Sequence, residues 1–231
     1  MMIFNNNKYK LKIFSLNRYY RKFLKLDLKL SNYLNEIIIG CLLGDLTAER
    51  KNKNCNTRLQ FKQSIINIDY INHLYELFKD YCGTPPKTLS KFDKRPNKMK
   101  IYNAIKFQTL SLPCFNIYKE LFYNSEGIKI IPSNIEELLT PISLAYWIMD
   151  DGYKFNKALY ISTESFKQND LILLTKILKK KFNLESSIHK TTNGYRIYIF
   201  STSKEKLINL VKPYFIIHFY YKLGLISNIN I

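Results

Sequence analysis

Two aspartates stand at the ends of two apolar segments, where an acid is costly. Asp45 closes the segment IIGCLLGD, and Asp151 closes the segment LAYWIMDD. If both segments are helices, each carboxylate lies at the helix end that carries partial negative charge, beside side chains that cannot solvate it. A divalent cation would offset both costs, and hard carboxylate oxygens suit Mg²⁺. Two such acids meeting at a pseudo-two-fold axis would form a metal site that faces two phosphates.

The helix expected over 35–46 also carries Gly40 and Gly44, which lie four residues apart on one helix face. Small residues at these positions let a second helix approach closely. Such an approach would bring Asp45 and Asp151 together. The alternative is that the two glycines simply pack under another neighbour.

The expected elements repeat in the same order along the chain. Residues 58–64 alternate polar and apolar side chains, which predicts a half-buried strand, and Asn193-Gly194 marks a hairpin turn between 185–190 and 195–201. Both halves are therefore expected to be α-β-β-α-β-β-α, with the first strand of each poorly defined. We interpret this as an internal duplication and predict an α+β fold of two pseudo-symmetric repeats. The expected parts are a basic arm (1–33), a first repeat (34–124), a linker (125–139) and a second repeat (140–231).

The charge of the chain indicates a polyanionic partner. Lys plus Arg number 36 against 18 acids, a formal net charge of +18 over 231 residues. The apolar stretch 37–44 is far too short to span a membrane, so we expect no membrane partner. No secretory signal is visible. Eight of the basic residues fall within 1–30, which is either a solvated arm or an arm that follows phosphates.

Other metal sites are not indicated. The four cysteines show no C-x-x-C spacing, and His73, His189 and His218 are scattered. Ile, Lys, Asn, Tyr and Phe, all with AT-rich codons, make up half of the chain. This bias indicates an AT-rich, organellar gene, and part of the lysine excess can follow from it.

The segments 38–46 (IIGCLLGDL) and 144–152 (LAYWIMDDG) resemble two copies of the LAGLIDADG motif. The stretch 139–152 is especially similar to intron-encoded homing endonucleases of this family from yeast mitochondria. The resemblance implies a monomer in which the motif helices pack at the interface beneath a saddle of antiparallel sheets. It also implies site-specific cleavage of both strands of a long asymmetric DNA site, with Mg²⁺ as cofactor (Mn²⁺ or Ca²⁺ able to take its place), and short 3′ overhangs. The expected location is the mitochondrion.

The same resemblance implies the residues of the active site. Asp45 and Asp151 match the metal ligands. Lys129 and Lys222 match the lysines that organise the attacking water and stabilise charge at the phosphate. Gln60 matches a polar residue near the first acid, and Asp150 is an accessory acid at most.

The sheets of this family lie in successive major grooves, where alternate outward side chains read base edges. The alternation expected along the strands gives the candidates for base contacts. A one-residue error in the assumed alternation would turn a candidate inward. The candidates are Arg58, Gln60, Lys62, Tyr102, Lys106, Gln108, Lys190, Arg196 and Tyr198.

The two segments depart from the motif at several positions, and the sequence also allows other functions. Leu46 replaces the closing glycine, Leu43 replaces the internal acid, and Tyr146 stands where the first motif has Gly40. The main alternative is an RNA maturase on the same fold, which assists splicing of its intron RNA. A non-cleaving nucleic-acid binder is a second alternative, although retention of both Asp45 and Asp151 favours cleavage.

Overall fold

The computed structural model describes residues 27–225, apart from 94 and 96–98, and most of the expected basic arm lies outside the described residues. The first half contains α3 (Asn32–Leu43), β1 (Thr47–Glu49), β2 (Arg58–Ser64), α4 (Ile68–Phe78), β3 (Lys87–Asp93), β4 (Lys100–Gln108) and α5 (Asn116–Phe122). The second half contains α7 (Pro141–Asp151), β5 (Gly152–Phe155), β6 (Ala158–Ser162), α8 (Gln168–Phe182), β7 (Ser186–Thr191), β8 (Gly194–Ile199) and α9 (Lys204–Val211). Both halves have the order α-β-β-α-β-β-α, which confirms the predicted fold class. The short helices α6 (Ile135–Leu138) and α10 (Tyr220–Leu223) are added to this plan.

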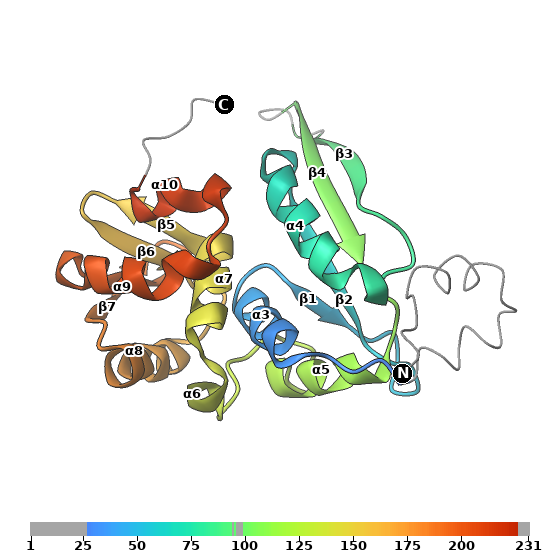
Figure 1. Ribbon diagram of the computed structural model, residues 1–231, viewed down its shortest axis with the longest axis horizontal. Helices are drawn as coiled ribbons and strands as arrows, with labels where there is room; N and C mark the ends of the chain where they lie inside the picture. The colour runs from blue at the N-terminus through green and yellow to red at the C-terminus, as the bar shows by residue number, and fades with distance from the viewer. Residues whose placement is uncertain (1–26, 94, 96–98, 226–231) are drawn as a thin grey trace, which may run out of the picture.

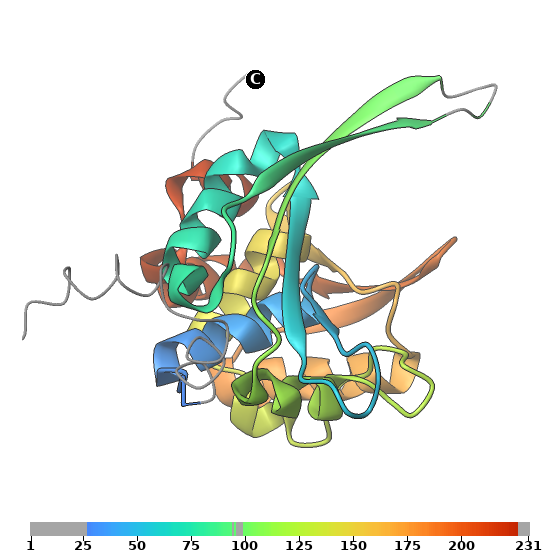
Figure 2. The ribbon, with the colours of Figure 1, turned by 90° about the vertical axis from the view of Figure 1, so that its right-hand side faces the viewer.

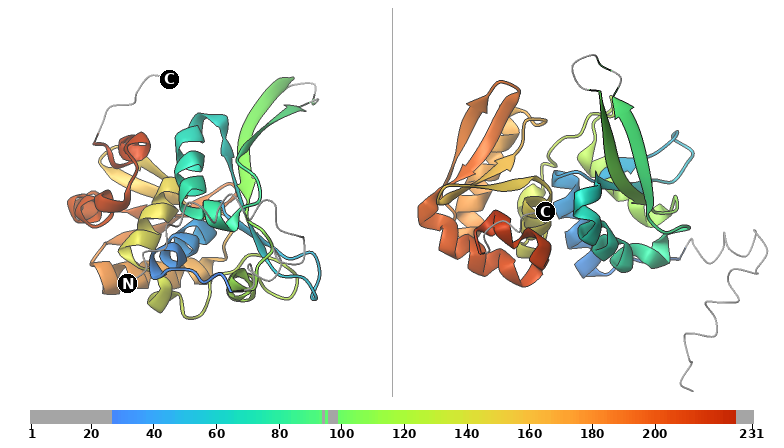
Figure 3. Two further views of the ribbon diagram at one scale, coloured as in Figure 1. Left: turned by 45° about the vertical axis from the view of Figure 1, so that its right-hand side comes forward. Right: turned by 90° about the horizontal axis from the view of Figure 1, so that it is seen from above.

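Each half builds one antiparallel four-stranded sheet. The strand orders are β1-β2-β4-β3 and β5-β6-β8-β7, so the two sheets have equivalent topologies. The β3–β4 hairpin reaches well beyond the rest of the first half (Figure 2). Seen from above, the sheets occupy separate halves and project to the same side of the central helices (Figure 3).

Alternation of side chains along the strands decides which sheet face is buried. In β2, Leu59 and Phe61 are buried whereas Lys62 is exposed. Phe61 stacks on Phe107 of the neighbouring β4 with ring centroids 4.5 Å apart, and α4 covers this apolar face with Phe78. The opposite face of the sheet keeps the polar side chains and stays open.

Helices α3 and α7 lie side by side at the centre of the molecule (Figure 1). Residues 37–43 of α3 and 143–149 of α7 are all buried, so both helices are apolar on every side and must lie in the core. Each begins with a hydroxyl N-cap: Ser31 accepts from the backbone N–H of Leu34, and Thr140 forms a capping box with Ser143. The close approach expected at Gly40 is confirmed, because a Cβ there would lie 2.2 Å from the backbone oxygen of Ser143.

A histidine joins α4 to α7 beside this helix pair. His73 Nε2 lies 2.7 Å from the hydroxyl of Tyr146, and burial lowers the pKa of His73 below its ordinary value of 6.5. At His73, the unfolded chain therefore binds more protons than the folded chain as the pH falls through 6.5. This histidine alone lowers the free energy of unfolding as the pH is lowered through this range, so we expect the change in the free energy of unfolding on acidification to be less destabilising in His73→Gln than in the unchanged chain. Urea unfolding of both proteins at pH 7.5 and pH 5.5 measures this difference. An equal change in the free energy of unfolding between the two pH values in both proteins would contradict the prediction.

Within the described residues, no helix is both long and apolar enough to cross a membrane. The four cysteines form no disulfide, and Cys41 is buried in α3.

Candidate functional site

The two motif aspartates emerge at equivalent ends of the helix pair, in slightly different ways. Helix α3 ends at Leu43, with Gly44 as its C-cap, so Asp45 lies just beyond the helix; Asp151 is the last residue of α7. Strand β1 begins two residues after Asp45, and β5 begins directly after Asp151. Each carboxylate therefore stands at the junction between a core helix and the first strand of a sheet.

Asp150 occupies the interface between the two helix ends. Its Oδ2 accepts the backbone N–H of Asp45 at 3.2 Å, across 105 residues of sequence. Gly44 makes room for it, because a Cβ at Gly44 would lie 2.5 Å from the Cβ of Asp150. The glycine of one motif and the acid of the other are therefore complementary, and Asp150 fixes the backbone that carries Asp45.

Gln63, rather than Gln60, reaches the acids. The Nε2 of Gln63 donates to Oδ2 of Asp45 at 2.7 Å and lies 3.4 Å from Oδ1 of Asp150. Gln60 instead donates to the carboxylate of Glu49, on the open face of the sheet. This corrects the expectation that placed Gln60 beside the first acid. The alternation in the sequence did not identify Gln63, because this residue has the phase of the buried Phe61 on β2. Its long side chain nevertheless extends past the edge of the core to the acids.

Two of the carboxylates, those of Asp150 and Asp151, have raised pKa values. Burial, followed by the charges of Asp45 and Asp151, raises the pKa of Asp150 well above its ordinary value. Burial and the charge of Asp45 raise the pKa of Asp151 to about 7, while Lys222 and Lys129 act in the opposite direction. Like charges this close favour a neutral acid or a bound cation.

Lys129 and Lys222 hold equivalent positions at the ends of the motif helices. Lys129 Nζ donates to the backbone oxygens of Gly44 at 2.8 Å and Leu46 at 2.9 Å. Lys222 Nζ donates to the backbone oxygens of Met149 and, at 3.1 Å, Asp150. Each ammonium satisfies carbonyls at a helix end and lies beside a motif acid. Burial lowers the pKa of both lysines, that of Lys222 to about 8.

The donor set suits a cation that also binds substrate. No group of three or more His, Cys, Asp or Glu side chains in the described residues forms a complete metal cage. Asp45 and Asp151 offer hard oxygens, and Mg²⁺ is commonly held by one or two carboxylates, waters and the phosphates of its substrate. The residues present therefore fit a cation shared between the protein and a phosphodiester.

The comparison with family models decides the classification. The model described as the LAGLIDADG DNA endonuclease family matches residues 35–207, which include both motif segments and both sheets. The chain belongs to the LAGLIDADG DNA endonuclease family.

Relatives and a solved structure agree with this assignment. The chain is 36% identical to a cytochrome b mRNA maturase bI2 from Debaryomyces hansenii, over 82% of this chain and 72% of the relative. It is 36% identical to the protein of the same name from Saccharomyces cerevisiae, over 95% of this chain but 53% of that relative. It is 34% identical to a probable intron-encoded endonuclease 1 from Wickerhamomyces canadensis, over 84% and 85%. The homing endonuclease I-WcaI, solved with its DNA recognition sequence, matches with a TM-score of 0.83 and 30% identity, over 92% of this chain and 94% of that one.

The open face of the first sheet of this LAGLIDADG chain is polar and basic. Register pairs Gln60 with Gln108 and Lys62 with Lys106, and Tyr102 has the same phase along β4. All six first-sheet candidates therefore share one face. Arg58 is held by Glu49 there, which lowers the pKa of Glu49.

Two further lysines join this face from β3. Lys87 pairs with Lys106, and Lys91 pairs with Tyr102. The alternate positions of Lys87, Leu89 and Lys91 in the sequence are the signal that could have identified them.

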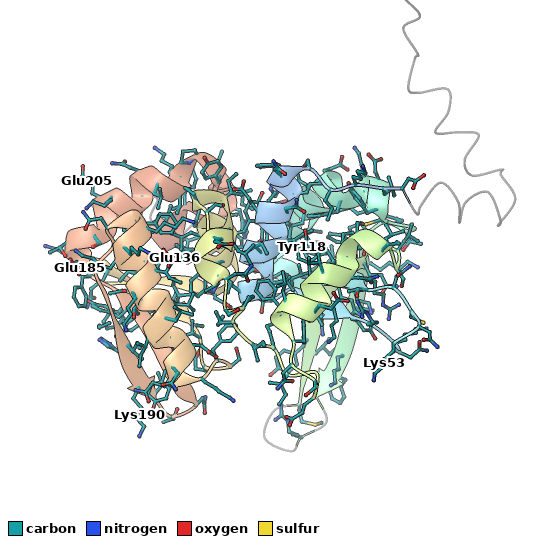
Figure 4. All side chains as sticks on the ribbon, turned by 90° about the horizontal axis from the view of Figure 1, so that it is seen from below. Lys53, Tyr118, Glu136, Glu185, Lys190 and Glu205 are labelled. Carbon is teal, nitrogen blue, oxygen red and sulfur yellow. The ribbon has the colours of Figure 1, made fainter. Side chains whose placement is uncertain are left out.

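On the second sheet one candidate is out of phase. Arg196 and Tyr198 share the open face, where Arg196 is paired with Glu164. Lys190 has the phase of Ile188, whose partner Ile197 is fully buried, and it lies far out on the β7–β8 hairpin (Figure 4). The placement of Lys190 on the open face was wrong, because His189 occupies that phase.

Proposed function

We propose that this chain is a site-specific endonuclease that cleaves both strands of DNA with Mg²⁺ and leaves short 3′ overhangs. The single observation that supports it most is the placement of Asp45 and Asp151 at equivalent ends of the packed helices α3 and α7. Family membership and endonuclease relatives support the same reaction.

In this proposal each residue of the site has a defined task. Asp45 and Asp151 hold the cation, which when bound polarises a phosphate and increases the acidity of a water. Lys129 and Lys222 fix the helix ends and keep positive charge beside the phosphate that is attacked. Gln63 orients the carboxylate of Asp45 through its 2.7 Å hydrogen bond.

The partner in this proposal is a long, asymmetric duplex. The sheets open to the same side of the helix pair, so that one duplex can run along both (Figure 3). One chain supplies two unlike halves, so a monomer suffices and the site need not be palindromic. The similar homing endonuclease I-WcaI is itself bound to its DNA recognition sequence in its solved structure.

A second function is supported by a separate observation. Two relatives, each 36% identical, are named cytochrome b mRNA maturases. We therefore propose intron RNA as a second partner, and mitochondrial origin as the source of the AT-rich codon bias.

Cleavage of a randomised-site DNA library tests the main proposal. We expect Mg²⁺-dependent double-strand cuts at one sequence, abolished by EDTA, with 3′ overhangs in the sequenced ends. Binding of duplex DNA without cleavage in any divalent cation would contradict the proposal. In that case, splicing of the host intron with and without the protein would test the maturase function directly.

A further inference from the structure

The open faces of the two sheets differ in chemistry. The first sheet presents Lys62, Lys87, Lys91 and Lys106. Among the described outward positions of β5–β8, Arg196 is the one cation, and Glu164 neutralises it. The second sheet instead carries six aromatic side chains, which we call the aromatic face: Tyr153, Phe155, Tyr160, His189, Tyr198 and Phe200.

These rings form one continuous layer across the strands. Register places Tyr153 opposite Tyr160 and Tyr160 opposite Tyr198. Tyr153 stacks on Tyr160 with centroids 5.4 Å apart, and His189 stacks on Tyr198 at 4.8 Å. Phe155 at the edge remains 48% exposed. A partner that binds the open face of the second sheet would therefore meet mainly aromatic ring carbons.

Much of the polar capacity of this face is already used within the protein. The hydroxyl of Tyr160 lies 2.8 Å from Nδ1 of His189, whose Nε2 lies 2.9 Å from the hydroxyl of Ser187. The hydroxyl of Tyr153 accepts from Nη1 of Arg196 at 2.9 Å. These internal hydrogen bonds leave the polar groups of this face with less capacity to bind base edges.

The aromatic face is continuous with the candidate active site, because β5 begins at Gly152, the residue after Asp151. A duplex held at that acid must pass over this face. In the major groove the apolar group is the 5-methyl of thymine, which packs against apolar side chains. We infer that the aromatic face selects a thymine-rich half-site by packing against 5-methyl groups, whereas the first sheet reads the other half-site by polar contacts. The inference rests on the proposed function.

Deoxyuridine substitution tests it, because uracil lacks the 5-methyl group but keeps the base-pairing edge. The cleaved site from the library is remade with every thymine replaced in one half-site or in the other, and affinity is measured. We expect substitution in one half-site to weaken binding about fourfold for each methyl contacted. Substitution in the other half-site should have little effect. Phe155→Ser should reduce the larger response. Phe92→Ser, a change at a similarly exposed phenylalanine (46%) that has the opposite phase of β3 from Lys91 and so lies off the open face, should not.

Each other result overturns the inference. Three results would exclude the role of thymine methyl groups: equal responses in both half-sites, no response in either, or a cleaved site with two G·C-rich half-sites. Each of them would leave cleavage, and so the proposed function, intact. Equal affinity for the single strand would show that the rings stack on unpaired bases instead. Failure to bind or cut any duplex would overturn the proposed function together with this inference.

Discussion

Asp45→Asn is expected to slow DNA cleavage by about a thousandfold or more, and Asp151→Asn should do the same. Both changes keep the shape of the side chain and remove the charge that holds a cation. Neither side chain lies among the lysines of the first sheet or in the aromatic face. Affinity for the duplex should therefore remain close to that of the unchanged chain, and single-turnover cleavage with a parallel binding assay measures both.

Asp69→Asn is the matched control. Asp69 is an exposed carboxylate in the first turn of α4, and its side chain lies 3.8 Å from His218 rather than at the motif helices. This control variant should cleave at the unchanged rate. Unchanged rates in both Asp45→Asn and Asp151→Asn would contradict the metal role, and loss of binding in parallel with cleavage would show that the acids act on folding or docking instead.

Gly40→Ala is expected to lower the free energy of unfolding by about 3 kcal/mol, near the upper end for overpacking a core. The added Cβ would lie 2.2 Å from the backbone oxygen of Ser143. Backbone cannot rotate away as a side chain does, so α3 and α7 must separate. Separation weakens the contacts of the residues buried between them. In thermal unfolding we expect the midpoint to fall by about 6–12 °C.

Gly83→Ala is the control for this change. A Cβ at Gly83 would lie 3.1 Å from a methyl carbon of Leu110, the movable end of a side chain. We expect a much smaller loss of stability there. An equal loss in both variants would show that the general cost of replacing glycine, and not the helix contact, determines the result. Gly40→Ala should also reduce cleavage, because Asp45 and Asp151 are brought together by the same contact.

The sequence alone was enough to predict the fold and the location of Asp45 and Asp151 near the ends of the two core helices, since both depend on local signals. Period-two alternation in 58–64 and two apolar segments in register with a repeat are visible without any tertiary contact. Alternation also placed six of the nine proposed contact residues on the open face of the first sheet, and Arg196 and Tyr198 on that of the second. The positions of Asp45 and Asp151 follow from the motif, whose last acid lies at the C-terminal end of α7 and just beyond that of α3.

Only the tertiary structure decided which side chains reach across from one element to another. Gln63 donates to Asp45, whereas Gln60 donates to Glu49. Which of the two side chains meets the acid depends on how β2 lies against the end of α3. Asp150 fills the space left by Gly44, a contact between residues 106 positions apart that no local pattern contains. Lys190 fell out of phase because hairpin register was fixed by pairing with β8. Periodicity specifies a face, whereas packing and register specify the neighbour that the face meets.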